Sequence, residues 1–334
     1  MVTVEDRQER DGLLTEDEAA LYDRQLRLWG VDAQRRLISS RILIIGLGGL
    51  GAELAKNIIL GGVKSVTLMD DSVVTEVDAA SQFLVSREAV GKNRAEASVV
   101  NARKLNPMVK VDADSSNPDD KPEKFFEDFS VIVATNCTKK QILSLNRIAR
   151  INNIKFFAAD VFGFTSFMFS DLGEHQYRKE IVTQSTKTLP ESTKVIEGVS
   201  RFAPFQDLLN LDWSLDELSK RAKKTNPAFF ALFVLLDFIE EKNRRPDPFK
   251  READYLELLN RRDAYVERHG ISKEKVPDEL FTDVFGAIAP VCAITGGVVS
   301  QEVVKAVSHK DVPLVNLFVY NPVDGTGYVE DFAG

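Results

Sequence analysis

The sequence predicts an α/β protein built on a doubly wound, mostly parallel sheet with helices on both faces. A short β-branched run, Ile42 to Ile45, is followed by glycines at G-x-G-x-x-G spacing and then by apolar residues at helical spacing. A second apolar strand is expected from Val66 to Met69. Further along the chain, strand-like and helix-like segments alternate, which is the pattern of a parallel sheet covered by crossover helices.

Composition limits the classes of function. The chain has 334 residues, of which 44% are hydrophobic, so one or two packed domains are expected. The net charge of −8 argues against binding nucleic acid by charge alone. Two distant cysteines and three scattered histidines predict neither a disulfide framework nor a zinc site. The longest apolar stretch, 285–299, contains Gly296 and Gly297, which favours a buried helix over a membrane span.

The N-terminal part is expected to be helical after a polar tail. Residues 1–14 are predicted to be disordered. Thr15 and Glu18 have the spacing of a capping box, so a helix should begin there and end at Gly30. Tyr22 and Trp29 share one face of this helix, whereas Arg24 lies off that face. A second short helix is expected over 33–37.

The glycine turn is a candidate nucleotide site. Gly46, Gly48 and Gly51 would let the backbone approach a phosphate, whose charge the following helix N-terminus favours. Asp70 ends the second strand, where an acid contacts ribose in dinucleotide-binding folds. A glycine pattern alone is weak support, because the same turn also serves close packing of a helix on a sheet.

The rest of the chain is predicted in three parts. Residues 15–175 would form the first part of the α/β domain, with helices over 91–105 and 139–150 and strands over 131–135, 156–159 and 165–169. Residues 176–280 would form a helical insertion without cysteine, whose first part, 176–205, is polar and expected to be irregular. In it, Asn226 and Pro227 predict a helix start ahead of a phenylalanine-rich core helix. Residues 281–334 would complete the α/β domain, with a hairpin at Asp324-Gly325.

Several motifs together resemble the ubiquitin-like protein activating enzymes, which have a Rossmann-like adenylation fold of the ThiF/MoeB type. The resemblance covers nearly the whole chain and narrows to the smaller, non-catalytic subunits of SUMO-activating enzymes. The matching segments are 22–30, 46–53, 81–84, 91–96, 160–164, 172–175 and 289–293. In that family a modifier is adenylated with ATP and Mg²⁺ and then passed to a cysteine. The two-subunit members pair two homologous α/β domains, of which one is catalytic.

Several catalytic residues of that family are replaced in this chain. Where catalytic members have Asn-Leu-Asn-Arg, which holds ATP phosphates, the chain has Asp78 to Ser81. A family lysine is Arg94 here, which is not its geometric equivalent. The Mg²⁺-binding Asp-Asn is Asn136-Cys137, and an amide is a poorer ligand for this cation than a carboxylate. The resemblance therefore implies a pseudo-adenylation domain in which Gly46, Gly48, Gly51, Asp70 and Arg94 are vestigial.

The resemblance places the chemistry in a partner. It implies an obligate heterodimer with the larger catalytic subunit, which would bind ATP, Mg²⁺ and SUMO, while this chain carries no cofactor or metal of its own. The matching arginine of the family reaches into the partner's ATP site, so Arg24 is the candidate catalytic residue in trans. The insertion has no cysteine, and Cys137 and Cys292 are expected to be packing residues.

Two other functions remain open from the sequence. One is a self-sufficient homodimeric adenylyltransferase of the ThiF/MoeB type, which the replaced motifs disfavour. The other is an NAD-dependent oxidoreductase, which the position of Asp70 permits but for which no catalytic pair is visible. A variant of the heterodimer hypothesis is that the chain is an inactive subunit for another ubiquitin-like modifier. Family resemblance alone implies a nuclear location, with the cytoplasm as a second compartment.

Overall fold

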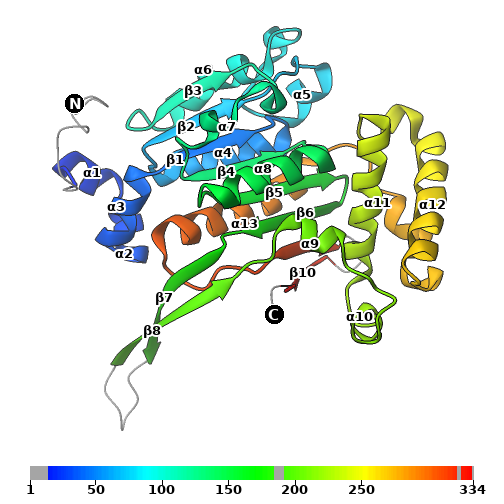
Figure 1. The fold of residues 1–334 in the computed structure, drawn as a ribbon. Helices are drawn as coiled ribbons and strands as arrows, with labels where there is room; N and C mark the ends of the chain where they lie inside the picture. The colour runs from blue at the N-terminus through cyan, green and yellow to red at the C-terminus, as the bar shows by residue number, and fades with distance from the viewer. Residues whose placement is uncertain (1–13, 184–191, 322–324, 333–334) are drawn as a thin grey trace.

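The computed structural model describes residues 14–183, 192–321 and 325–332, and Figure 1 shows a central sheet with helices on both faces. Within these ranges the main sheet has eight strands in the order β10-β9-β6-β5-β4-β1-β2-β3. Strands β3-β2-β1-β4-β5 pair in parallel, and β6, β9 and β10 extend the sheet in antiparallel. The predicted doubly wound, mostly parallel α/β fold is therefore confirmed. The tail predicted to be disordered lies outside the described residues, apart from its last residue.

The predicted strands lie close to their expected ranges, whereas the strand over 110–114 was not predicted. The strands are β1 (Arg41–Ile45), β2 (Ser65–Met69), β3 (Lys110–Asp114), β4 (Val131–Thr135), β5 (Lys155–Phe162), β6 (Thr165–Asp171), β9 (Leu317–Asn321) and β10 (Thr326–Glu330). One face is covered by α3 (Val31–Ser39), α4 (Gly49–Gly61), α6 (Arg94–Leu105) and α13 (Ala289–Ser308). The other is covered by α7 (Glu123–Phe126), α8 (Lys139–Ile151), α9 (Phe205–Leu209) and α11 (Pro227–Lys242). α5 (Glu76–Ser81) lies between β2 and α6 in the chain.

Strand β1 shows why the sheet is covered on both sides. Its residues Ile42 and Ile44 belong to the hydrophobic cluster under α4 and α13, whereas Leu43 and Ile45 belong to the cluster under α8 and α11. Successive side chains of a strand point to opposite faces, so an unbroken β-branched run buries both. This is why the central strands were readable from the sequence.

The N-terminal segment forms two helices, whereas one continuous helix was expected. α1 (Glu16–Leu21) has the predicted capping box of Thr15 and Glu18, and α2 (Asp23–Trp29) ends at Gly30. The helix breaks at Tyr22, whose φ is −100° and ψ is 17°. The Tyr22 side chain is buried, and its hydroxyl accepts a hydrogen bond of 3.0 Å from Asn106 Nδ2. The bend therefore lets one aromatic residue anchor both helices on the fold.

Within the described part of 176–205, the prediction of irregular structure was wrong, because residues 176–183 and 192–201 lie in strands. β7 (Glu174–Thr183) and β8 (Ser192–Arg201) pair in antiparallel and form a separate hairpin that projects from the body of the molecule in Figure 1. The strands show no alternation of apolar and polar residues because the hairpin packs little of either face on the core. Apolar side chains along it remain partly exposed, among them Ile181, Val195, Ile196 and Val199. The insertion is helical only from α9 onward.

The helical part follows the prediction more closely. Asn226 caps α11 with Pro227 at its first position, and the phenylalanines of α11 are buried. α10 (Asp216–Ala222) precedes α11, and α12 (Arg251–Arg268) packs against it at one end of the sheet (Figure 1). α13 then returns the chain to the sheet, and β9 and β10 form the expected antiparallel pair. The turn residue Asp324 lies outside the described residues, and the division into domains stays a prediction.

Helix α13 is the one helix of the described ranges long and apolar enough to cross a membrane. However, 61% of its apolar window is buried inside the fold. It packs on α4, α3, β5 and β6, and the small residue Gly296 lies against Glu53 of α4. A core helix of this kind satisfies the same length and composition criteria as a membrane span.

Candidate functional site

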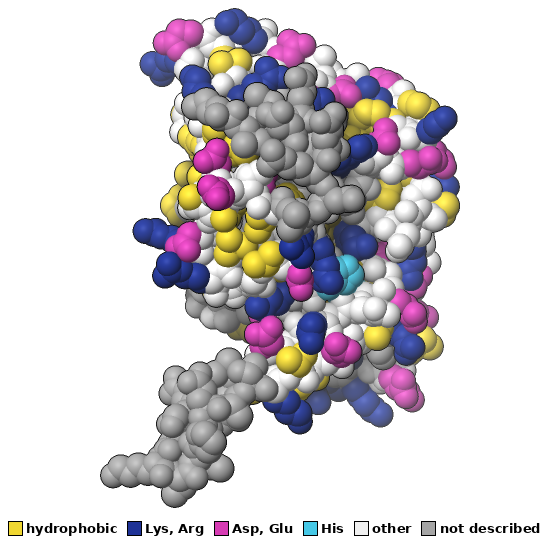
Figure 2. Space-filling view, turned by 90° about the vertical axis from the view of Figure 1, so that its left-hand side faces the viewer, with side chains coloured by type: hydrophobic (Ala, Val, Ile, Leu, Met, Phe, Trp, Pro, Cys, Tyr) yellow, Lys and Arg dark blue, Asp and Glu magenta, His cyan; other side chains and the backbone are white. Residues whose placement is uncertain are grey.

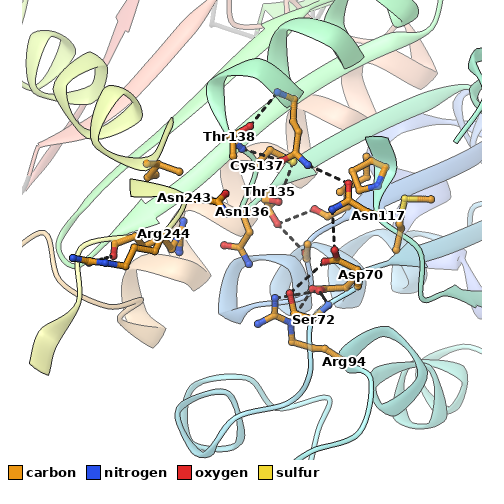
Figure 3. Close-up of a pocket in the computed structure, with 18 residues that line it drawn as sticks. Asp70, Ser72, Arg94, Asn117, Thr135, Asn136, Cys137, Thr138, Asn243 and Arg244 are labelled. Atoms are coloured by element: carbon orange, nitrogen blue, oxygen red, sulfur yellow. Dashed lines mark hydrogen bonds and ion pairs between the residues drawn. The ribbon is translucent and has the colours of Figure 1, made fainter. Parts of the chain in front are cut away.

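A cavity of about 360 Å³ lies where a doubly wound sheet usually binds its ligand. After β1 the chain moves outward through β2 and β3, and it then crosses back to β4 on the other side of β1. The cavity opens at the carboxyl ends of β1, β2 and β4, so it lies at this switch point. Figure 3 shows its lining, in which Asp70, Asn117 and Asn136 from separate loops converge with Arg94 from the start of α6.

The glycine turn is held tightly against β4. Gly46 has a φ of +83°, and a Cβ at this position would lie 2.2 Å from the carbonyl oxygen of Thr135. A Cβ on Gly51 would lie 1.9 Å from the carbonyl oxygen of Gly46. The Thr135 hydroxyl donates a hydrogen bond of 2.8 Å to this same carbonyl. These two glycines are therefore required by the turn itself, whether or not a phosphate binds there.

Asp70 makes its contacts within the protein. Its buried carboxylate accepts hydrogen bonds from the backbone N–H of Leu47, at 2.6 Å, and of Ser72, at 2.9 Å. Leu47 is the second residue of the glycine turn, so a donor that could face a phosphate is directed at a carboxylate instead. Asp70 thus stabilises the glycine turn. Its sequence position had suggested that it would contact a ribose instead.

Arg94 is neutralised by two carboxylates. Its Nε and Nη2 donate to Asp70 at 2.8 and 3.2 Å, and its Nη1 donates to Asp78 at 3.0 Å. Burial alone would lower the pKa of Arg94, but the charges and hydrogen bonds of Asp70 and Asp78 outweigh it and raise that pKa. Asp78 is held in turn by Thr75, with which it forms the capping box of α5. The positive charge of Arg94 is therefore already paired with carboxylates of its own chain.

Asn136, which stands where the family has its Mg²⁺-binding aspartate, lies beside the glycine turn. Asn136 has a φ of +56°, and its amide nitrogen would lie 2.9 Å from a Cβ on Gly48. The space above Gly48, which a phosphate would need, is thus bounded by a neutral amide. Among the residues that the structure describes, no three His, Cys, Asp or Glu side chains are grouped to hold a metal ion.

The opposite wall comes from residues that the sequence analysis did not select. Arg244 and Arg245 follow α11 and line the cavity. Arg244 forms a two-point ion pair with Asp254, both bonds being 2.6 Å, and Arg245 pairs with Asp160. Two adjacent arginines directly after an apolar helix are a weak signal, since such pairs commonly lie in solvent. Only the folded chain brings them opposite the glycine turn.

These observations decide whether ATP and Mg²⁺ fit this site. The Leu47 N–H is bonded to Asp70, Arg94 is paired twice, and Asp70 and Asp78 add negative charge beside the turn. A triphosphate would have to displace these contacts and approach two carboxylates. The residues that surround the glycine turn therefore do not fit ATP with Mg²⁺.

Arg24 lies apart from these residues. Helices α2 and α3 dock on the far end of α4. Gln25 Nε2 of α2 donates to the Leu60 carbonyl at 3.4 Å, and Gln34 Nε2 of α3 donates to the Gly61 carbonyl at 3.1 Å. The glycine turn is at the other end of α4, about 20 Å away for a helix of this length. Arg24 is exposed and has no bonded partner among the described residues. Its exposed guanidinium is therefore accessible to another molecule.

Its neighbour Arg27 differs from Arg24. Arg27 forms an ion pair of 3.0 Å with Asp23, one helical turn earlier. Pairs at this spacing on an exposed helix hold both side chains along the helix surface. Of the two arginines on α2, Arg24 is thus the one whose charge no neighbour on its own helix matches.

Both cysteines are buried. Burial raises the pKa of the Cys137 thiol to about 12 and that of Cys292 to about 11. A thiol needs its thiolate form to act as a nucleophile, so neither side chain is set up for thioester chemistry. The expectation that both are packing residues agrees with this burial.

Comparisons with known proteins agree in family and in fold. The ThiF family model matches residues 22–332. SUMO-activating enzyme subunit 1 of Homo sapiens is 40% identical over 97% of this chain and 98% of its own length. The same subunit of Rattus norvegicus is 41% identical over 95% of both chains. The crystal structure of SeMet PaaA superposes with a TM-score of 0.59 at 18% identity, covering 98% of this chain and 86% of that one, and this likeness concerns the fold alone.

Proposed function

The chain belongs to the ThiF family, and from this premise we propose that it is the non-catalytic subunit of a heterodimeric SUMO-activating enzyme. A larger partner subunit would bind ATP, Mg²⁺ and SUMO and would carry the cysteine that receives SUMO. This chain would complete the pair of α/β domains, in the nucleus and also in the cytoplasm. Similarity to SUMO-activating enzyme subunit 1 along 97% of the chain supports this, because a numbered subunit implies another one.

The observation that carries the non-catalytic part of the proposal is the pairing of Arg94 with Asp70 and Asp78. A catalytic adenylation site needs unpaired donors where phosphate charge develops. Here the Leu47 N–H and the Arg94 guanidinium, two donors beside the glycine turn, are bonded to carboxylates of the same chain. An enzyme assembled from two subunits can tolerate this if the other subunit retains its donors.

Arg24 is the residue that we propose this chain supplies to the partner's ATP site. A guanidinium presents several N–H donors in a planar fork that matches phosphate oxygens, and it keeps its charge at all relevant pH values. Placed against the phosphates by a neighbouring subunit, it would stabilise the charge that shifts during adenylation. Its exposed position, distant from its own glycine turn, supports a role in trans.

The two alternatives need contacts that this chain does not leave open. A homodimeric adenylyltransferase would need a free cation on the phosphate side of the cavity, but Arg94, which lines it, is paired with Asp70 and Asp78. An NAD-dependent oxidoreductase would need the Asp70 carboxylate to accept from ribose, but this carboxylate already accepts from Leu47, Ser72 and Arg94. Both alternatives predict that the isolated chain binds nucleotide.

Pyrophosphate exchange tests the proposal. The purified single chain should give negligible SUMO-dependent exchange of labelled pyrophosphate into ATP, and adding the larger subunit should restore exchange. Rapid exchange by the single chain would show that it is an adenylating enzyme itself and would contradict the proposal.

The heterodimer then tests Arg24. The Arg24→Ala variant should slow adenylation about 100-fold or more, the size of effect seen when a donor to a developing negative charge is removed. Arg35→Ala is the matched control, since Arg35 is an exposed arginine on the neighbouring helix that pairs with Asp32. Co-purification with the larger subunit should be unchanged in both variants. Equal adenylation rates for the wild type and Arg24→Ala at saturating ATP and SUMO would exclude the role in trans.

A further inference from the structure

A second cavity, of about 610 Å³, lies on another side of the molecule. It is bounded by β7 and β8 near the root of the hairpin, by α3, and by the residue that ends α13. Figure 2 views the side of the molecule that includes these elements and shows a histidine among Lys and Arg side chains. The cavity shares no lining residue with the one at the switch point.

The walls of this cavity carry more positive than negative charge. Arg36 of α3, Arg178 of β7 and His309 face it, and Glu197 of β8 is the one acidic residue among its described lining. Arg178 and Glu197 are 3.8 Å apart, which is a loose pairing. The Arg36 guanidinium is fixed by a hydrogen bond of 2.5 Å from Nη1 to the carbonyl of Ser308. Two arginines and one titratable imidazole therefore reach the cavity from three separate elements.

His309 is held with one ring edge free for a ligand. Its Nδ1 lies 2.7 Å from the carbonyl oxygen of Gln176, so the Nδ1–H donates to that carbonyl. The Nε2 of a neutral ring is then an acceptor, and it becomes a donor once the ring is protonated. The backbone of the same residue pairs with β7 through the hydrogen bond from Arg178 N to His309 O, at 2.8 Å.

A second histidine lies directly behind the first. The rings of His175 and His309 stack at 4.7 Å between centroids and at an angle of 15°. His175 is 2% exposed, and its Nε2 has no hydrogen-bond partner within the described part of the chain. Burial, His309 and Lys155 lower the pKa of His175 to about 4. Burial also lowers the pKa of His309, as do Arg36 and Lys155, while the bond to Gln176 raises it.

The lining of this cavity has more basic than acidic side chains, which favours an anionic ligand. We propose that this cavity binds a phosphate group, free or carried by a small organic molecule, through Arg36, Arg178 and the protonated His309. Donors from three directions suit a tetrahedral oxyanion better than a planar carboxylate. The cavity is larger than phosphate alone, and Tyr177 and Val199 in its wall offer apolar surface to an attached organic group.

Phosphate binding should also change the protonation of His309. The groups facing this ring are Arg36 from α3, Lys155 from β5, His175 and Arg178 from β7, and Glu197 from β8. An anion bound among them favours the imidazolium form, so the pKa of His309 should rise on binding. By linkage, a phosphate in one fixed charge state should bind more tightly as the pH falls through that pKa.

Histidine NMR provides a direct test, because the full chain has only three histidines. The ring resonances would be followed on the full chain from pH 5 to 8 with inorganic phosphate, with phenyl phosphate, or with sodium chloride at matched ionic strength. We expect both phosphates to shift the His309 resonance saturably and to raise its pKa by about one unit. Tighter binding of phenyl phosphate would identify an organic phosphate as the ligand, and equal binding would identify the phosphate group alone. His269, which ends α12 and stacks on Tyr265, should not respond.

Variants make the test specific. Arg178→Gln should weaken phosphate binding about tenfold or more and should fold normally, because its side chain is 63% exposed and its strand contacts are made by the backbone. Arg35→Gln removes the same charge from α3 outside the cavity lining and should bind like the wild type. A His309 response no larger than that to sodium chloride, or equal responses in the wild type and Arg178→Gln, would overturn the proposal.

Discussion

At the scale of single residues, Arg94 shows how a basic side chain can line a cavity while its charge is paired within the chain. The sequence retains a basic residue at this position, so charge alone would suggest continued phosphate binding. In the folded chain the guanidinium donates three hydrogen bonds to Asp70 and Asp78. Asp78 begins the segment that replaces the Asn-Leu-Asn-Arg of the catalytic members, and the structure identifies Arg94 as its partner.

The glycines of the turn should behave as structural residues. Gly51→Ala should destabilise the chain by about 2–4 kcal/mol, because the new Cβ would meet the Gly46 carbonyl oxygen at 1.9 Å. Gly297→Ala, on the exposed side of α13 with no atom within 4 Å of its Cβ position, should stabilise by about 0.5–1 kcal/mol. Urea unfolding of the two variants measures both effects. A Gly51→Ala variant as stable as the wild type would show that the turn can relax.

His175 predicts a pH dependence of stability. Its pKa is lowered in the fold to about 4, mainly by burial, from an unperturbed value near 6.5. Between these values the unfolded chain binds a proton that the folded chain does not, so the stability present above pH 6.5 is lost as the pH falls towards 4. The loss should be on the order of 2 kcal/mol.

The matched variant for this effect is His175→Phe, which keeps a flat ring on His309. Urea unfolding at pH 7 and at pH 5 should show a smaller loss of stability on acidification in His175→Phe than in the wild type. Identical pH dependence in the two proteins would mean that other groups are responsible.

At the scale of elements, the two N-terminal helices illustrate a local prediction altered by one tertiary contact. The capping box of Thr15 and the stop at Gly30 are local signals, and both were read correctly. The break at Tyr22 depends on Asn106, 84 residues away, which a local reading does not include. This contact also orients α2, so that Gln25 faces α4 and Arg24 faces outward.

Tyr22 is therefore a positioning residue for Arg24. Tyr22→Ala should destabilise the isolated chain by about 3 kcal/mol, since a buried aromatic side chain is removed. In the heterodimer it should slow adenylation as Arg24→Ala does, while leaving the KM for SUMO unchanged. Leu28→Ala, on the same helix and 72% exposed, should change the stability of the isolated chain by less than about 0.5 kcal/mol. Adenylation at the wild-type rate in Tyr22→Ala would show that Arg24 does not depend on Tyr22 for its position.

The β7–β8 hairpin shows why one element was missed. A strand is recognised from the sequence when one of its faces is buried, because apolar residues then recur at every second position. Both hairpin strands are stabilised mainly by their mutual backbone ladder, and the partner strand cannot be known before the chain folds. The hairpin in turn carries Arg178 and Gln176 to the second cavity.

At the scale of the whole molecule, the chain has the architecture of a nucleotide-binding fold with its own charges paired inside. Thermal unfolding of the isolated chain should therefore respond to neither ATP with Mg²⁺ nor NAD at millimolar concentrations. A ligand at concentration c stabilises a fold by RT ln(1 + c/Kd), so a ligand whose Kd lies far above its concentration leaves the melting temperature nearly unchanged. The shift should be below about 1 °C. A dose-dependent rise with either nucleotide would revive the corresponding alternative.

The sequence by itself determined the fold class, the central strands, the glycine turn and the family, because each depends on local patterns or on motifs in fixed order. Tertiary structure decided what those motifs do. It placed Asp78 on Arg94, directed the Leu47 N–H at Asp70, brought Arg244 and Arg245 across the cavity, and separated Arg24 from the turn by the length of α4. The physical reason is that whether a charge or donor is free depends on its distances to groups far away in the sequence, which only the packed chain defines.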